Sequence, residues 1–247
     1  MKQIITMGLL WIVASIQVYA ESMPDDYPQS LHKELQMLQN TGASIASDPK
    51  VLTTLSRLYL RMGDDLWTDT SQRIEAYQAG ARFALQALQL NEANAFAHFL
   101  YAANAGTAAH LQGLAAAARA VPDLKAHVRR ALQLQPDHPP SLHMMGRMLE
   151  ELPWIMGGDS DKALAYLSRA VVVDPTYAHA RLDLARLYIK RKNFEWARRE
   201  LDTLLSLPHP NDPYAWSHRY RPQAEKLLAE VKDEVEKKDA KYRADPR

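Results

Sequence analysis

The chain contains no cysteine, and this absence excludes several kinds of chemistry. Without thiols it has no disulfide, no thiolate nucleophile, no cysteine-ligated metal and no lipid attached through sulfur. The chain also lacks an excess of charge of one sign, because 30 Lys and Arg residues face 29 Asp and Glu residues. Such a balance provides no overall field that attracts polyanions, so we expect no nucleic-acid partner.

The first 20 positions are dominated by apolar residues. Lys2 supplies a positive charge, residues 4–16 are mostly apolar, and Val18 and Ala20 place small side chains before a cleavage point. This pattern is typical of a secretory signal peptide. A membrane anchor is the alternative, but it needs about 20 apolar residues and the run is shorter. We therefore predict a signal peptide over residues 1–20, a periplasmic location and no stable membrane anchor after cleavage.

Helical periodicity and self-similarity extend from about residue 52 to residue 207. This region is rich in Ala, Leu and Arg and has no alternating Val/Ile/Thr run of the strand type. Three segments end in nearly the same way, at residues 87–91, 131–136 and 170–175. We interpret each as the last turn of the second helix of a hairpin, and two of them end in a proline that cannot continue a helix.

This repeated unit resembles the tetratricopeptide repeat, in which two antiparallel helices occupy about 34 residues. The last unit matches best, and its packing positions are Leu184, Ala185, Tyr188, Ala197, Leu201 and Leu204. In the preceding unit, Gly146 is small enough to let the two helices approach closely. The resemblance implies an all-α, right-handed solenoid of about four helical hairpins with capping helices.

Two insertions lengthen the array, near residues 106–123 and 151–159. With them, the chain is similar to the periplasmic T component of tripartite ATP-independent periplasmic transporters, and also to the regulator-of-microtubule-dynamics repeat family. The first resemblance implies a protein partner such as a periplasmic substrate-binding protein. The transporter component is typically a lipoprotein, and membrane tethering is not implied for a chain without cysteine.

The predicted organisation has four parts. They are the signal peptide (1–20), an N-terminal capping helix (21–47), the repeat array (48–207), and a connector with four prolines followed by a C-terminal capping helix and a frayed tail (208–247).

Nine histidines form no recognisable catalytic or metal-binding motif. There is no His-Glu-x-x-His, and the nearby pair His138 and His143 lies on either side of a predicted helix start. The segment 157–160 is interpreted as a turn in which Asp159 or Ser160 caps the next helix, with an anion-binding loop as the alternative. We therefore predict no catalytic residue, metal or cofactor, and no enzyme.

In tetratricopeptide repeats, fixed positions of the first helix of each unit line an inner groove. The resemblance therefore implies partner-binding roles for Arg57, Arg61, Phe96, Phe99, His143, Arg147, His179, Arg186 and Lys190. Three of these arginines share one repeat position and can clamp carboxylates with planar guanidinium groups. The alternative is that they form salt bridges within the stack. Both interpretations stay open at this point.

The insertions also bear on the function. They can close the groove into a pocket with Trp154 and Met156 as its walls, or these side chains can pack within their own unit. The sequence predicts an interaction scaffold that holds a protein or peptide on the inside of the solenoid. The alternative is a carrier of an anionic or apolar small molecule in an enclosed pocket.

Overall fold

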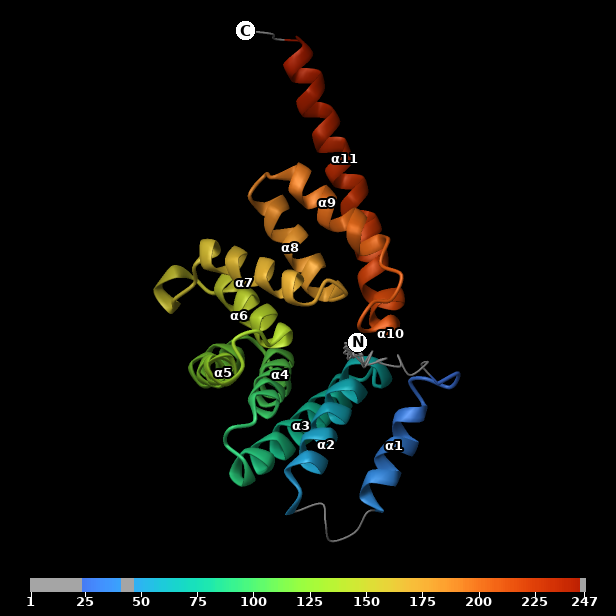
Figure 1. Cartoon of the computed structure of the whole chain (residues 1–247), viewed down its shortest axis with the longest axis vertical. Coiled ribbons are helices and arrows are strands. Elements are labelled where there is room, and N and C mark those ends of the chain that lie inside the picture. Colours follow the sequence, from blue (N-terminus) through green and yellow to red (C-terminus); the bar gives the residue numbers. More distant parts are fainter. Residues whose placement is uncertain (1–23, 41–46, 245–247) are drawn as a thin grey trace, which may run out of the picture.

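The computed structural model describes residues 24–40 and 47–244, with side chains up to residue 236. Every regular element in these residues is helical, and the helices form successive antiparallel hairpins (Figure 1). The hairpins are α2 (Pro49–Arg61) with α3 (Thr70–Leu90), α4 (Ala95–Leu111) with α5 (Leu114–Leu134), α6 (Pro139–Glu151) with α7 (Ser160–Val173), and α8 (Ala178–Lys190) with α9 (Phe194–Leu205). The predicted all-α tetratricopeptide-repeat solenoid is confirmed.

Further helices flank the array at both ends. At the start α1 (Ser30–Gln39) packs against α2, and at the end α11 (Arg221–Ala244) packs against α9 and extends beyond the hairpins (Figure 1). Short helical turns connect the longer elements: η2 (Met62–Leu66), η3 (Trp154–Met156), α10 (Pro213–Ala215) and η4 (Trp216–Tyr220). The predicted signal peptide lies outside the described residues. The predicted frayed tail is helical as far as Ala244.

Capping side chains fix where the helices begin. The side chains of Asp48, Asp69, Asn94 and Asp159 accept backbone N–H groups at the starts of α2, α3, α4 and α7. Each cap satisfies a donor that the first helical turn leaves without a partner. Before α7, Gly157 has a φ of 81°, which glycine adopts without steric cost. The segment 157–160 therefore has the geometry of a capped turn.

Small side chains lie where the two helices of a hairpin meet. Ala87, Ala131 and Ala170, the repeated alanines of the second helices, are fully buried. Leucines fill the space around them, and one continuous core joins the second, third and fourth hairpins. A second core joins α8, α9 and α11. Each hairpin therefore buries its apolar face against its neighbours, as expected of a solenoid.

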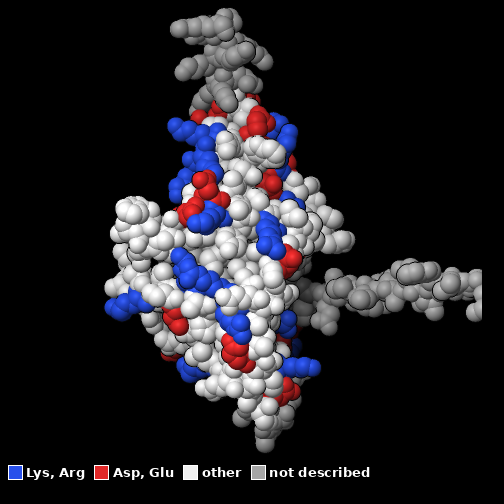
Figure 2. All heavy atoms as spheres, turned by 60° about the vertical axis from the view of Figure 1, so that its left-hand side comes forward, with Lys and Arg blue, Asp and Glu red and all other residues white. Residues whose placement is uncertain are grey.

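The surface carries both signs of charge. On the face shown in Figure 2, Lys and Arg side chains lie interspersed with Asp and Glu side chains over the solenoid. This mixture agrees with the near-zero formal net charge of the chain.

Within the part of the chain that the structure describes, none of the helices combines the length and the apolar character that crossing a bilayer requires.

Gly146 provides a test of the repeat register. A Cβ atom built on Gly146 meets Cγ of Leu167 at 2.7 Å and the carbonyl oxygen of Ala163 at 3.3 Å, so α6 and α7 have no room for a side chain there. We expect Gly146→Leu to overpack this contact and lower the free energy of unfolding by about 1–3 kcal/mol. Urea unfolding followed by circular dichroism measures the loss, and an unchanged midpoint contradicts the close approach.

Candidate functional site

An open chamber of about 650 Å³ lies between the N-terminal helix, the first hairpin and the C-terminal connector. Its lining comes from three separate parts of the chain: Pro24, Tyr27, Ser30 and Glu34; Arg57 and Arg61; and Asn211, Asp212, Pro213 and Tyr214. The chamber therefore brings together two of the predicted groove residues, Arg57 and Arg61, both from α2.

The two arginines of the chamber differ in their surroundings. The Arg61 guanidinium lies 5.1 Å from the ring centroid of Tyr27, and its Nη1 is 3.6 Å from Oε2 of Glu34. Arg57 is exposed and makes no hydrogen bond or ion pair with any other described residue. The rings of Tyr27 and Tyr214 meet edge to face, with their centroids 4.8 Å apart. Among the described residues, the chamber thus offers a cation without an ion-pair partner beside an aromatic wall, a combination that suits a carboxylate-bearing group.

The connector at residues 208–220, which we call the strap, runs from α9 to α11. It contacts both the last hairpin and the first hairpin. Near the last hairpin, the backbone N–H of Asn211 donates to the carbonyl oxygen of Thr176 at 3.1 Å. The indole N–H of Trp216 donates to the carbonyl oxygen of Leu204, also at 3.1 Å. In Figure 1 the strap passes from the end of α9 to α10, which lies beside the first hairpin.

Shortly before α11, the strap contacts the first hairpin through Arg219. This arginine pairs with Asp65 and donates to the carbonyl oxygen of Asp64 at 3.2 Å. The Asp65 carboxylate, 2% exposed, also accepts a hydrogen bond from the hydroxyl of Tyr27. Arg219 and Asp65 are 154 residues apart in the sequence. This contact therefore joins the two ends of the solenoid.

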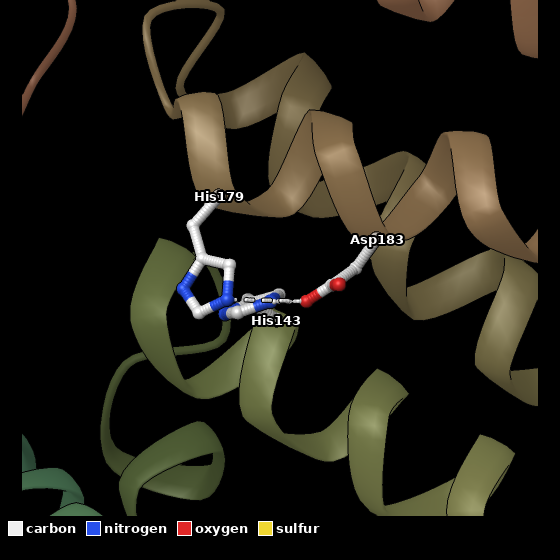
Figure 3. A group of neighbouring side chains, drawn as sticks. All are labelled: His143, His179 and Asp183. Atoms are coloured by element: carbon white, nitrogen blue, oxygen red, sulfur yellow. Dashed lines mark hydrogen bonds and ion pairs between the residues drawn. The ribbon is translucent and has the colours of Figure 1, made fainter. Parts of the chain in front are cut away.

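A second group of polar side chains, the inner cluster, lies between the third and fourth hairpins (Figure 3). It consists of His143 and Arg147 from α6 and of His179, Asp183 and Arg186 from α8. The Asp183 side chain is 2% exposed. Its Oδ2 accepts from Nε2 of His143 at 2.7 Å, and its Oδ1 lies 2.8 Å from Arg147 Nη1 and 2.7 Å from Arg186 Nη1. The buried carboxylate is therefore fully surrounded by donors.

The electrostatics of the inner cluster favour a fixed charge distribution. Burial alone would raise the pKa of Asp183, but the hydrogen bond from His143 and the nearby cationic groups hold this pKa far below its usual range. Burial lowers the pKa of His179, and the charge on His143 and the two arginines lowers it further. Asp183 therefore stays ionised and His179 neutral near pH 7, as suits a brace between hairpins.

The inner cluster also has the residue types of a metal site. His143, His179 and Asp183 place three potential ligand atoms within 4.8 Å of one another (Figure 3). However, two guanidinium groups already contact the carboxylate, and a cation would lie beside both. It would also have to displace the proton that His143 donates to Asp183. We therefore interpret these residues as a structural brace.

Predicted groove residues in this region are engaged within the stack. Arg147 also pairs with Glu151, Arg186 also donates to Gln223, and Lys190 pairs with Glu150. The structure thus brings His143, Arg147, His179 and Arg186 into one cluster and leaves Arg57 apart from it at the chamber. The three arginines that share a repeat position do not form one row of free cations, and their partner-binding roles stay predictions.

Phe96 and Phe99 form a third group. Their rings stack with centroids 6.0 Å apart, and the His138 ring meets both edge to face at 5.8 and 5.6 Å. His138 is buried, and burial lowers its pKa to about 4. The two phenylalanines, partly buried, are therefore packed beneath a neutral imidazole and do not line the chamber.

The apolar residues of the second insertion neither line a pocket nor pack within their own unit, the two roles that the sequence suggested. Trp154 is 84% exposed and Met156 is 40% exposed, and neither lines the chamber. The reason lies in the backbone, because the N–H of Asp159 bonds to the carbonyl oxygen of Leu149 and closes the loop directly onto α6. The intervening turn η3 projects outward. The expectation that a large apolar side chain such as Trp154 is buried was therefore wrong.

Sequence reasoning missed the residues that close the chamber. Tyr27, Asp65 and Arg219 come from three segments outside the repeat positions, and no spacing in the sequence links them. It also missed Asp183, for which a signal existed. His179 and Asp183 are four residues apart and therefore share one face of a helix.

The inner cluster predicts that its arginines stabilise the fold while Arg57 does not. Arg147→Gln and Arg186→Gln each remove a charge-assisted hydrogen bond from a buried carboxylate, so each variant should lose about 1–3 kcal/mol in free energy of unfolding. Arg57→Gln, at an exposed and unpaired position, should stay within about 0.5 kcal/mol of the parent. Urea unfolding at pH 7 compares the three variants, and equal losses contradict the distinction.

Burial of His138 predicts a loss of stability in mild acid. Below its ordinary pKa of 6.5, His138 takes up a proton in the unfolded chain, but not in the folded chain until the pH nears 4. Stability therefore falls as the pH decreases through this range, by about 1.4 kcal/mol for each pKa unit. Urea unfolding at pH 7 and pH 5 should show a smaller loss for His138→Gln than for the parent. The control His110→Gln, at an exposed position, should retain the full loss.

Comparison with known proteins supports both the fold and the family. The family model described as regulator of microtubule dynamics protein 1-3 matches residues 18–155, and a tetratricopeptide repeat model matches residues 155–218. Regulator of microtubule dynamics protein 1 of Bos taurus is 29% identical over 142 residues, which are 51% of this chain and 44% of the bovine protein. Regulator of microtubule dynamics protein 3 of Rattus norvegicus is 25% identical over 211 residues, 77% of this chain and 44% of the rat protein.

Among solved structures, a thermophilic tetratricopeptide-repeat protein of Thermus thermophilus is similar in fold. It has a TM-score of 0.59 at 15% identity and covers 79% of this chain and 91% of its own. At this identity the likeness concerns the fold alone. The chain matches less than half the length of the curated relatives.

These comparisons correct one prediction and leave others open. The periplasmic location is wrong, because the matching relatives are regulators of microtubule dynamics from animals, whose cells have no periplasm. The signal peptide and the resemblance to the transporter T component stay predictions. Since the family model covers more than half of the sequence, from residue 18 to residue 155, the chain belongs to the regulator of microtubule dynamics protein 1-3 family.

Proposed function

We propose that the chain is an interaction scaffold that holds an acidic segment of a protein partner in the chamber beside α2. The observation that carries this proposal is the guanidinium of Arg57 at the wall of the chamber, which has no ion pair or hydrogen bond with the residues that the structure describes. A partner carboxylate bound there gains a charge-assisted hydrogen bond without breaking an existing ion pair. The scaffold acts by binding and needs no catalytic group.

The acidic residues of the chamber do not cancel this attraction. Glu34 faces the other arginine, Arg61. Asp212 accepts the backbone N–H of Ala215 and caps α10, and burial raises its pKa. Arg57 is therefore the charge that remains available to a ligand. The rings of Tyr27 and Tyr214 supply an apolar surface next to it.

A carrier of small anionic molecules is the second candidate, and the size of the chamber favours it. A volume of about 650 Å³ lies within the range of small-molecule pockets. The chamber is open and includes several charged side chains, which suits an apolar ligand poorly. Comparing the affinity of the chain for an acidic peptide with its affinity for a free dicarboxylate therefore discriminates between the two functions.

The relatives suggest which partner to test first. Both matching proteins are named as regulators of microtubule dynamics, and we propose that the acidic partner belongs to the microtubule system. A substrate-binding protein of a periplasmic transporter is no longer a candidate, because it depended on the location that the comparisons overturn.

The test uses a fluorescein-labelled hexaglutamate peptide and fluorescence anisotropy. Arg57→Glu should weaken binding of this peptide about ten-fold or more, because an attractive contact becomes a repulsive one. The matched control is Arg82→Glu, which makes the same charge change at an exposed residue of α3 outside the chamber and should bind like the parent. Co-sedimentation with polymerised microtubules then repeats the comparison with the proposed partner.

The possible outcomes separate the candidates. Equal weakening by Arg57→Glu and Arg82→Glu means that only net charge matters and rejects the chamber as the site. Binding of succinate at affinities similar to the peptide, with the same dependence on Arg57, supports the carrier instead. Peptide binding without co-sedimentation retains the chamber and removes microtubules as the partner.

A further inference from the structure

The strap divides the inner side of the solenoid. It leaves the last hairpin after α9, contacts the first hairpin through Arg219, and returns to the last hairpin at Tyr220, which stacks on His179 with ring centroids 4.7 Å apart. Residues 211–214 of the strap form one wall of the chamber. A segment that forms one wall of the chamber and contacts both ends of the array therefore limits how a partner can enter it.

The contacts of the strap with the last hairpin differ in kind from its contacts with the first hairpin. At the last hairpin it is held by apolar packing, since Trp216 contacts the core of α8, α9 and α11, and by two hydrogen bonds to backbone carbonyls. At the first hairpin the polar hold is concentrated on Asp65 and the adjacent carbonyl of Asp64. Beyond it, Tyr27 and Tyr214 meet in a single aromatic contact.

Asp65 is the point on which this end depends. Its buried carboxylate accepts from Tyr27 on the N-terminal side and pairs with Arg219 on the strap. The same carboxylate thus fastens two walls of the chamber, one before α1 and one after α9. Removing Arg219 leaves a buried charge with one partner fewer, and hydration then favours separation of the strap from the first hairpin.

We propose that the ion pair between Arg219 and Asp65 is a latch, and that its opening separates the first hairpin from the strap and widens the chamber for the partner. The proposal rests on the proposed function for the identity of the partner. The last hairpin keeps its hold on the strap during this opening. The latched state limits the width of the open chamber, and the unlatched state lets a longer segment of the partner reach Arg57.

Absence of cysteine from the chain allows a direct measurement of access that needs no partner. Ser30, in the chamber wall, is replaced by cysteine as the single thiol, and its rate of reaction with a bulky anionic maleimide is recorded. In this background Arg219→Gln should raise the rate about ten-fold, the change expected when one charge-assisted hydrogen bond is lost from an opening equilibrium. The matched control Arg169→Gln removes an exposed arginine that pairs with Asp137 away from the strap and should leave the rate unchanged.

Exchanging the two charges distinguishes an opened latch from a misfolded variant. Asp65→Arg and Arg219→Asp are each expected to open the latch, and the double variant should restore slow labelling because the opposite charges meet again. Hydrogen exchange of residues 212–220 and 62–67 should rise in the single variants and recover in the double variant. Circular dichroism should show equal helix content in all of them. Equal labelling rates in the parent and in a folded Arg219→Gln variant overturn the latch.

Hexaglutamate binding in the same variants separates the two proposals. A faster association rate in Arg219→Gln, with the peptide still dependent on Arg57, supports both. Faster labelling without any peptide binding, in the parent or the variant, supports the latch as a gate of the chamber and rejects the acidic partner. Unchanged labelling together with normal peptide binding retains the partner and rejects the latch.

Discussion

The fold depends on close approach of helices within each hairpin. Ala87, Ala131 and Ala170 have no exposed surface, and Gly146 has no room for even a Cβ atom. Where the contact residue is this small, two helices can bring their flanking leucines into one core, which supplies most of the favourable burial. Insertions are tolerated because they lengthen helices or loops at the ends of a hairpin and leave this contact in place. The stacking of hairpins, and hence the inner surface, follows from the same geometry.

Polar residues between hairpins obey a different constraint. Asp183 is buried among four charged or polar neighbours, two guanidinium groups and two imidazoles. The cost of burying its charge is low only while those partners stay in place. Each partner is thereby committed to the stack. A residue at a groove position can therefore belong to the brace instead of the binding surface, and the position within the repeat does not decide between these roles. What decides is the presence of a buried opposite charge on the adjacent helix.

Much of the fold could be predicted from the sequence, because local patterns encode it. The repeated alanines and the spacing of leucines indicate hairpins, and turn residues such as Gly157 and Asp159 indicate where one helix stops and the next begins. The site was harder to predict. Arg57 at the chamber follows from the repeat register, whereas Tyr27, Asp65 and Arg219 meet only because the array curves enough to bring its ends together. Trp154 shows the opposite failure, since its apolar side chain lies on an outward turn fixed by backbone hydrogen bonds.

Curvature of the array also explains why the chamber lies at the first hairpin. A solenoid with an open inner surface offers similar positions in every unit. In the later units, however, the residues at these positions belong to the inner cluster or contact the strap. Arg147 is paired by Asp183 on the following hairpin, whereas α4, the corresponding helix after Arg57, contains no acidic residue. Arg57 therefore lacks the partner that Asp183 provides for Arg147 and Arg186. An unpaired cation at the end of the array is kept from nonspecific contacts by the walls around it, one from the N-terminal segment and one from the strap. An identical repeat position is thus available for recognition where the helix that follows it carries no buried acid.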